Sequence, residues 1–133
     1  GWLLHWRSGA DQSLALRLCE RAEAAGVDTD RGVAVNLIDP RGTVLDADAR
    51  LWPQTERLKA ALAFREHDER WTERARQAHD ALFRYTEGAP EGLWRDVMTP
   101  DGRLRPEGAP TSSLYHITGA ISELARAAGV AEA

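Results

Sequence analysis

Cysteine is almost absent from this 133-residue sequence, and the one present, Cys19, has no partner for an internal disulfide. Lysine and arginine are scattered without a basic block and the net charge is −4, so a nucleic-acid partner is not expected. No apolar run approaches the roughly 20 residues that a membrane helix needs, so no membrane partner is expected either. A lone thiol is compatible with a reducing compartment, and we expect a cytoplasmic protein.

Sequence signatures of metal, phosphate and acyl chemistry are also missing. There is no Gly-rich phosphate loop and no GxSxG elbow. The histidines show no metal-ligand spacing; they are His5, His67, His79 and His116. Cys19 lies on an apolar stripe without a base nearby in the sequence, so we predict a small core residue rather than a nucleophile. We therefore expect neither a cofactor nor a metal ion.

The residues that are present have a globular balance, with 43% hydrophobic and 29% charged side chains. The apolar run 1–6 has no N-cap before it and is typical of the tail of a helix. A helix over 12–25 is predicted next, capped by Asp11 and ended by Gly26. Its apolar positions step by four, four and three, and they are Leu14, Leu18, Ala22 and Ala25.

Two further helices are predicted in the middle of the chain. One begins at Trp52-Pro53, because proline suits the first helical turn. The other covers roughly 69–87 and follows a run of ionisable residues over 66–70. Both carry regular apolar stripes, which are Leu58, Ala61 and Leu62 in the first and Trp71, Ala75, Ala78, Leu82 and Tyr85 in the second.

The last predicted helix runs from a cap at Ser112 or Ser113 to about Ala128. Its apolar stripe is Leu114, Ile117, Ile121 and Leu124. His116 lies off this stripe, on a face of small and polar residues that suits an inner helix beside a cleft. A helix N-terminus disfavours the imidazolium, so His116 can stay neutral and act as a general base. The alternative is a histidine that only caps or braces the helix start.

Two short hairpins are predicted between the helices. The segments 33–45 and 93–104 each contain a turn rich in proline and glycine, Asp39-Pro40-Arg41-Gly42 and Thr99-Pro100-Asp101-Gly102. Each hairpin precedes a helix with an aromatic residue at its start, a weak repeat typical of a helical toroid. The predicted helices cannot close such a ring and would leave apolar surface open, so we expect more of the protein upstream of Gly1.

Trp52 and Glu56 are four residues apart and therefore share a helix face. A tryptophan beside a carboxylate is common in sugar sites, where the ring stacks on the sugar and the carboxylate binds hydroxyl groups. The same pair is equally common as a core aromatic residue next to a surface ion pair. Lys59, three residues after Glu56, is the partner that such an ion pair would use. Taken alone, the pair favours the second interpretation.

Several segments together resemble the N-acylglucosamine 2-epimerase family, which includes mannose isomerases. These segments are Trp2-Leu3-Leu4, Trp52-Pro53-Gln54-Thr55-Glu56, Gly92-Leu93-Trp94, Asp101-Gly102 and Tyr115-His116. In this order and spacing they resemble the C-terminal third of a family member, over almost the whole chain. The resemblance implies an all-α fold, an (α/α)6 barrel of which residues 1–133 form the C-terminal part, with short β-hairpins between helices.

The resemblance also implies metal-free isomerisation or 2-epimerisation of a monosaccharide such as mannose or N-acylglucosamine, through a cis-enediol. Two histidines serve as acid and base; His116 matches one, and the other would lie upstream of Gly1. Trp52, Glu56 and Tyr115 match substrate-binding positions. The 133 residues alone are therefore expected to be inactive, and a homodimer is left open. The segment Ala109–Leu114 departs from the Trp and Pro of some members, which favours a monosaccharide isomerase over a disaccharide epimerase.

Two other functions remain open at this stage. The first is a catalytically silent helical toroid that binds carbohydrate or protein, which an absent upstream histidine would favour. The second is a glycosidase on the same architecture, which needs two facing carboxylates. Glu56 supplies one of these, and no convincing second carboxylate is evident in the sequence.

Overall fold

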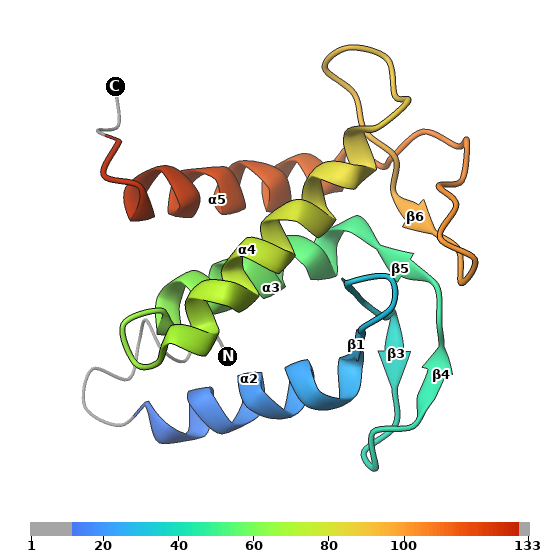
Figure 1. Cartoon of the computed structure of the whole chain (residues 1–133). Helices are drawn as coiled ribbons and strands as arrows, with labels where there is room; N and C mark the ends of the chain where they lie inside the picture. Colours follow the sequence, from blue (N-terminus) through green and yellow to red (C-terminus); the bar gives the residue numbers. More distant parts are fainter. Residues whose placement is uncertain (1–11, 131–133) are drawn as a thin grey trace.

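The computed structural model describes residues 12–130 and is mainly helical (Figure 1). Its helices are α2 (Ser13–Gly26), α3 (Leu51–Phe64), α4 (Glu69–Phe83), the 3-10 helix η1 (Arg84–Thr86) and α5 (Ser112–Ala127). Its strands are β1 (Val27–Asp28), β2 (Val33–Ala34), β3 (Leu37–Ile38), β4 (Val44–Asp46), β5 (Ala49–Arg50) and β6 (Val97–Met98). The predicted helix tail over 1–6 and the cap at Asp11 lie outside the described residues.

Helix α3 is the centre of the packing, with extensive contacts to both α4 and α5. Its predicted positions Leu58 and Ala61 are fully buried. The predicted stripe of α4 is also correct, because Trp71, Ala75, Ala78, Leu82 and Tyr85 are all buried. The helix itself ends at Phe83, and η1 continues the stripe to Tyr85. Among the described residues, no helix is both long and apolar enough to cross a membrane.

The prediction for α2 was wrong about which face is buried and how the helix ends. Leu14 and Leu18 are 52% and 46% exposed, whereas Ala15 and Cys19 are buried against the core. The small side chains of Ala15 and Cys19 let α2 lie close to the core, while Leu14 and Leu18 point away from it. Gly26 is the last helical residue rather than a left-handed cap, and the chain passes directly into extended β1 at Val27. Cys19 is a core residue as predicted, and burial raises the pKa of its thiol.

Both predicted turns form, but the strand pairing differs from the predicted hairpins. The amide of Gly42 donates to Asp39 O at 2.9 Å, and the amide of Gly102 donates to Thr99 O at 2.9 Å. The segment 33–38 contains two strands instead of one. Strand β2 pairs with β1, which precedes it in the chain, and β3 pairs with β4. Strand β6 pairs with the distant β5, and the expected second hairpin is reduced to a bridge between Met98 and Leu104.

Helix α5 packs on α3 through a face shifted from the predicted stripe, of which Ile117 still packs against the core. Ser113 and Ala120 are buried, while Leu114 and Ile121 of the predicted stripe are 46% and 39% exposed. Gly119 lies beside the Lys59 side chain, since a Cβ added at Gly119 would lie 3.8 Å from Lys59 Nζ. The predicted serine cap is also wrong. The N-cap is Thr111 without a side-chain bond, and the hydroxyl of Ser113 donates to Asp96 instead.

Candidate active site

The first turns of α3 and α5 bring together the four residues singled out in the sequence. Nδ1 of His116 lies 2.9 Å from Oε1 of Glu56. The ring centroids of Trp52 and His116 are 5.8 Å apart with tilted planes. The Tyr115 ring meets the His116 ring edge-on at 4.9 Å. Residues 60 positions apart in the chain therefore form one cluster at the ends of two packed helices.

Glu56 has two side-chain partners among the described residues, and the predicted ion pair with Lys59 is one of them. Lys59 Nζ lies 2.7 Å from Oε1 of Glu56, the same oxygen that contacts His116. Lys59 is only 4% exposed, so this is a largely buried ion pair rather than a surface one. An ionised carboxylate only accepts hydrogen bonds, which places the ring proton of His116 on Nδ1. Nε2 makes no hydrogen bond to residues 12–130, so it is available as a base.

Two hollows border this cluster. One, of about 350 Å³, is lined by Arg50, Trp52, Pro110, Ser112, Ser113 and His116. The other, of about 520 Å³, lies between α2 and α3 and has Trp52 and Glu56 on its wall. Trp52 is 41% exposed and stands between the two hollows. Its indole is thus not enclosed in the core of the described residues, and a flat ring of this kind can stack on a ligand.

The segment Trp52–Arg57 divides by face into residues that line the hollows and residues that anchor the helix. Gln54 is fully buried, and its side chain bonds both the amide and the carbonyl of Ala34, at 2.8 and 2.9 Å. Arg57 forms a forked ion pair with Glu23 of α2, at 2.7 and 3.1 Å. These bonds hold α3 against β2 and α2, which orients Trp52 and Glu56. The role of Gln54 was not predicted from the sequence, although Gln54 lies inside the segment Trp52–Glu56 that was singled out there.

Asp96 was also missed, and it connects the starts of both helices. It is 6% exposed, and its Oδ2 accepts from Arg50 Nη2 at 2.6 Å and Nε at 3.1 Å. Its Oδ1 accepts from the Ser113 hydroxyl at 3.2 Å, and its backbone oxygen accepts from the Leu51 amide at 2.8 Å. A buried carboxylate with this many donors is well compensated for the loss of water. No local pattern marks Asp96, because its partners are distant in sequence.

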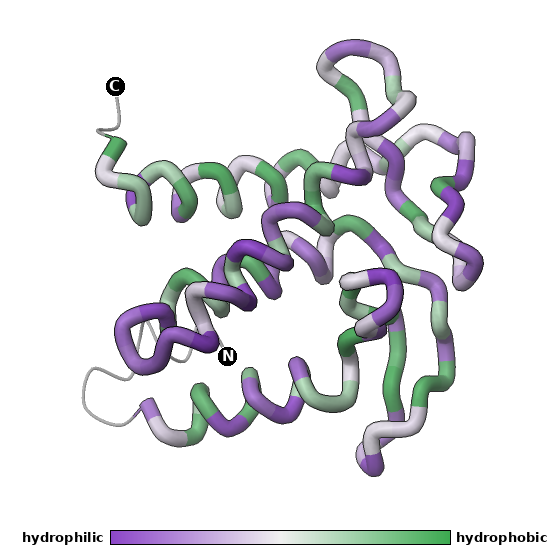
Figure 2. Tube along the Cα trace, viewed as in Figure 1, coloured by the Kyte–Doolittle hydropathy of each residue, from purple (hydrophilic) through white to green (hydrophobic). Residues whose placement is uncertain are grey.

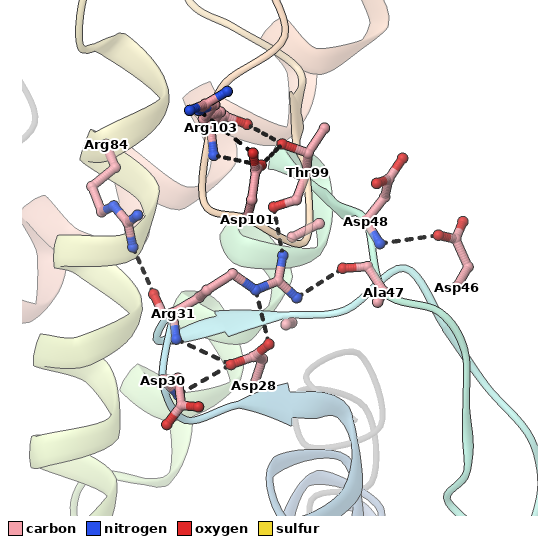
Figure 3. A network of polar contacts seen from close by, with 12 residues as sticks. Asp28, Asp30, Arg31, Asp46, Ala47, Asp48, Arg84, Thr99, Asp101 and Arg103 are labelled. Atoms are coloured by element: carbon pink, nitrogen blue, oxygen red, sulfur yellow. Dashed lines mark hydrogen bonds and ion pairs between the residues drawn. The ribbon is translucent and has the colours of Figure 1, made fainter.

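A second polar network, centred on Arg31, braces the loops next to β5 and β6 (Figure 3). The Arg31 guanidinium donates to Asp28 Oδ2 at 2.8 Å, to Ala47 O at 2.7 Å and to Thr99 O at 3.1 Å. Arg84 donates to the backbone oxygen of Arg31 at 2.6 Å. Hydrogen bonds from Arg31 lower the pKa of the Asp28 carboxyl. The network ties three loops to η1, which directly follows α4.

No group of three or more His, Cys, Asp or Glu side chains able to hold a metal ion occurs within residues 12–130. The chemistry available in the described part of the site is therefore that of one histidine, a carboxylate that orients it, and aromatic surface. Such a set suits proton transfer to or from a bound organic molecule.

Comparison with known proteins identifies the family to which this chain belongs. Residues 1–120 match the sequence model of N-acylglucosamine 2-epimerase (GlcNAc 2-epimerase), and the chain belongs to this family. It is 43% identical over 131 residues to the mannose-6-phosphate isomerase of Rhizobium meliloti (strain 1021), covering 92% of this chain and 34% of that protein.

A crystal structure of D-mannose isomerase has the same fold over the matched region. The TM-score is 0.75 at 23% identity, over 94% of this chain and 34% of that one. The chain thus spans about a third of the length of the relatives it matches. The mainly helical part of the predicted fold class is confirmed, while the closed (α/α)6 ring stays a prediction.

Proposed function

We propose that this chain forms part of a sugar aldose–ketose isomerase or 2-epimerase acting on a monosaccharide such as mannose or N-acylglucosamine. The family supports the reaction class. The observation that carries the proposal is the contact between His116 Nδ1 and Glu56 at 2.9 Å, beside the exposed ring of Trp52. It leaves Nε2 of His116 as a base next to a flat aromatic surface, an arrangement suited to a sugar.

In the proposed reaction, Nε2 of His116 removes the proton from C2 of the open-chain sugar while an acid protonates the carbonyl oxygen. The product of this step is a cis-enediol. Protonation at C1 with loss of the O2 proton yields the ketose. Protonation on the opposite face of C2 with loss of the O1 proton yields the epimer. Glu56 would hold the imidazole ring in position through its contact with Nδ1.

We also propose that the rest of the ring and the second histidine come from residues outside this chain. Support comes from the side chains that α2 and α5 leave exposed in residues 12–130, which include Leu14, Leu18, Leu114 and Ile121. The relatives are about three times as long, which is enough chain to cover these faces. Trp52 and Tyr115 are proposed to contact the sugar together with His116.

The test is His116→Asn in the full-length protein. Asparagine keeps hydrogen bonding but removes the titrating base, so kcat should fall by about 10²- to 10⁴-fold. Exchange of the substrate C2 proton with deuterated water should slow in parallel, because this exchange reports the enediol step. His79→Asn, at a half-buried position on α4 that lines neither hollow, is the matched control and should leave both rates unchanged. Near-normal turnover and exchange in His116→Asn would withdraw the proposal.

A further inference from the structure

Arg50 is a cationic side chain at the candidate site that neither the sequence motifs nor the proposed reaction assigns. It is the N-cap residue of α3 and lines the 350 Å³ hollow together with Trp52 and His116. Its side chain is 41% exposed although Asp96, its partner, is almost buried. The guanidinium therefore reaches from a buried anchor to the surface of the hollow.

The ion pair with Asp96 determines which guanidinium nitrogen of Arg50 faces outward. Nε and Nη2 of Arg50 both donate to Oδ2 of Asp96, at 3.1 and 2.6 Å, and Asp96 is held in turn by the Ser113 hydroxyl. The backbone of Arg50 pairs with Val97 across β5 and β6. Because the guanidinium is planar, two engaged nitrogens determine the direction of the third. Nη1 has no partner among residues 12–130, so it is a preoriented donor without an acceptor.

We propose that Nη1 of Arg50 donates a hydrogen bond to a hydroxyl oxygen of the sugar and is a specificity-determining contact of this site. The inference rests on the proposed function and adds a residue to it. A donor held in place by an ion pair loses little freedom when it binds, which makes the contact effective.

The local charges favour a hydroxyl over a phosphate as the acceptor. Arg50 is already paired with Asp96, and Lys59 is paired with Glu56 at 2.7 Å. A phosphate ester carries about −1.5 to −2 charges at neutral pH and needs cations beyond those already matched. The described part of the site offers balanced pairs, which suit a neutral donor–acceptor contact. An unphosphorylated monosaccharide is the substrate class that fits this arrangement.

The test compares Arg50→Gln with the wild type in the full-length protein, using D-mannose and mannose 6-phosphate as substrates. Loss of a contact made equally in ground and transition states raises KM and leaves kcat nearly unchanged. KM for D-mannose should rise by about 10-fold or more, the range of a lost hydrogen bond to a charged group. Arg50→Lys keeps the charge but not the planar, forked arrangement of donors. Its KM for D-mannose should therefore lie between those of the wild type and Arg50→Gln.

Two further variants separate binding from folding. The double variant Arg50→Gln, Asp96→Asn leaves no buried charge unpaired, and it should keep the raised KM with a normal melting curve. Arg105→Gln removes a similar ion pair, Arg105 with Asp48 at 2.6 Å, at a place outside the lining of the hollow. It should leave KM unchanged.

An unchanged KM for D-mannose in folded Arg50→Gln would overturn the inference, as would a KM effect confined to mannose 6-phosphate. If the wild type converts neither of these sugars nor an N-acylglucosamine, the proposed function fails separately. Arg50 is then judged by titrating D-mannose against tryptophan fluorescence, to which Trp52 contributes. Equal affinity in the wild type and Arg50→Gln, or no binding by either, would overturn the inference in that case too.

Discussion

Helices α4 and α5 both pack on α3, but the side chains that they bury differ in size. Helix α4 buries the large side chains of Trp71 and Leu82 beside alanines, with the Trp71 ring centroid 5.3 Å from that of Phe64. Helix α5 buries Ser113 and Ala120 and leaves larger apolar residues outside. Along the trace, α4 is mostly hydrophilic around this apolar seam, whereas apolar residues recur along α5 (Figure 2).

This difference separates a contact that stabilises the fold from one that assembles a site. Bulky residues between α3 and α4 exclude water over a broad area, which is the main source of stability in a small domain. The small buried residues of α5 contribute less burial, and the packing of α5 on α3 brings Nδ1 of His116 to 2.9 Å from Glu56. Substitutions at the two contacts should therefore have different consequences.

Trp71→Ala should cause the largest loss of stability. Removing a fully buried tryptophan leaves a cavity, and the expected cost is about 3–5 kcal/mol in the free energy of unfolding. The ring also loses its contact with the Arg74 guanidinium, which lies 4.3 Å from the ring centroid. Urea denaturation of the full-length protein measures the change. Phe83→Ala, on the same helix but at a 41% exposed position, is the control and should cost clearly less.

Ala120→Leu should reduce stability less but affect activity more. Ala120 is fully buried between α5 and α3, so extra methylene groups must push the helices apart, at a cost of about 1–3 kcal/mol. The separation should weaken the contact between His116 and Glu56, and kcat should fall in a protein that still folds. Ala128→Leu, at an exposed position next to the end of the same helix, provides the control. Wild-type kcat in Ala120→Leu would show that close packing is not required for the site.

Glu73→Gln on the outer face of α4 should have the smallest effect. Hydrogen bonds from Arg76 and Gln77 lower the Glu73 pKa from 4.5 to about 2. A lowered pKa stabilises the folded state above the unfolded value, and this contribution is lost as pH falls through the folded value. The variant should thus be slightly less stable than the wild type above pH 4.5, with no difference below about pH 2. Solvent screening keeps the effect small. Thermal melts from pH 2 to 7 test this, and a pH-independent difference would contradict it.

Helices α4 and α5 also show how much of the packing can be predicted from apolar periodicity. The stripe of α4 was predicted correctly because its large apolar residues have their partners within this chain. The stripe of α5 was only partly correct: Ile117 packs against the core, whereas Leu114 and Ile121 find no cover in residues 12–130. Apolar periodicity indicates which face of a helix is apolar, but it cannot indicate which neighbour that face meets. Pairing of β5 with β6 was missed for a related reason, since it joins segments far apart in the chain.

The sequence by itself determined the helical class, the two turns, and the choice of Trp52, Glu56, Tyr115 and His116 as candidates. These depend on local periodicity, on proline and glycine geometry, and on motif order, all of which are written along the chain. Only the tertiary structure decided that His116 contacts Glu56, and that Asp96 holds Arg50 at the hollow. Such contacts join residues brought close by packing, and no local pattern encodes a distance across the core.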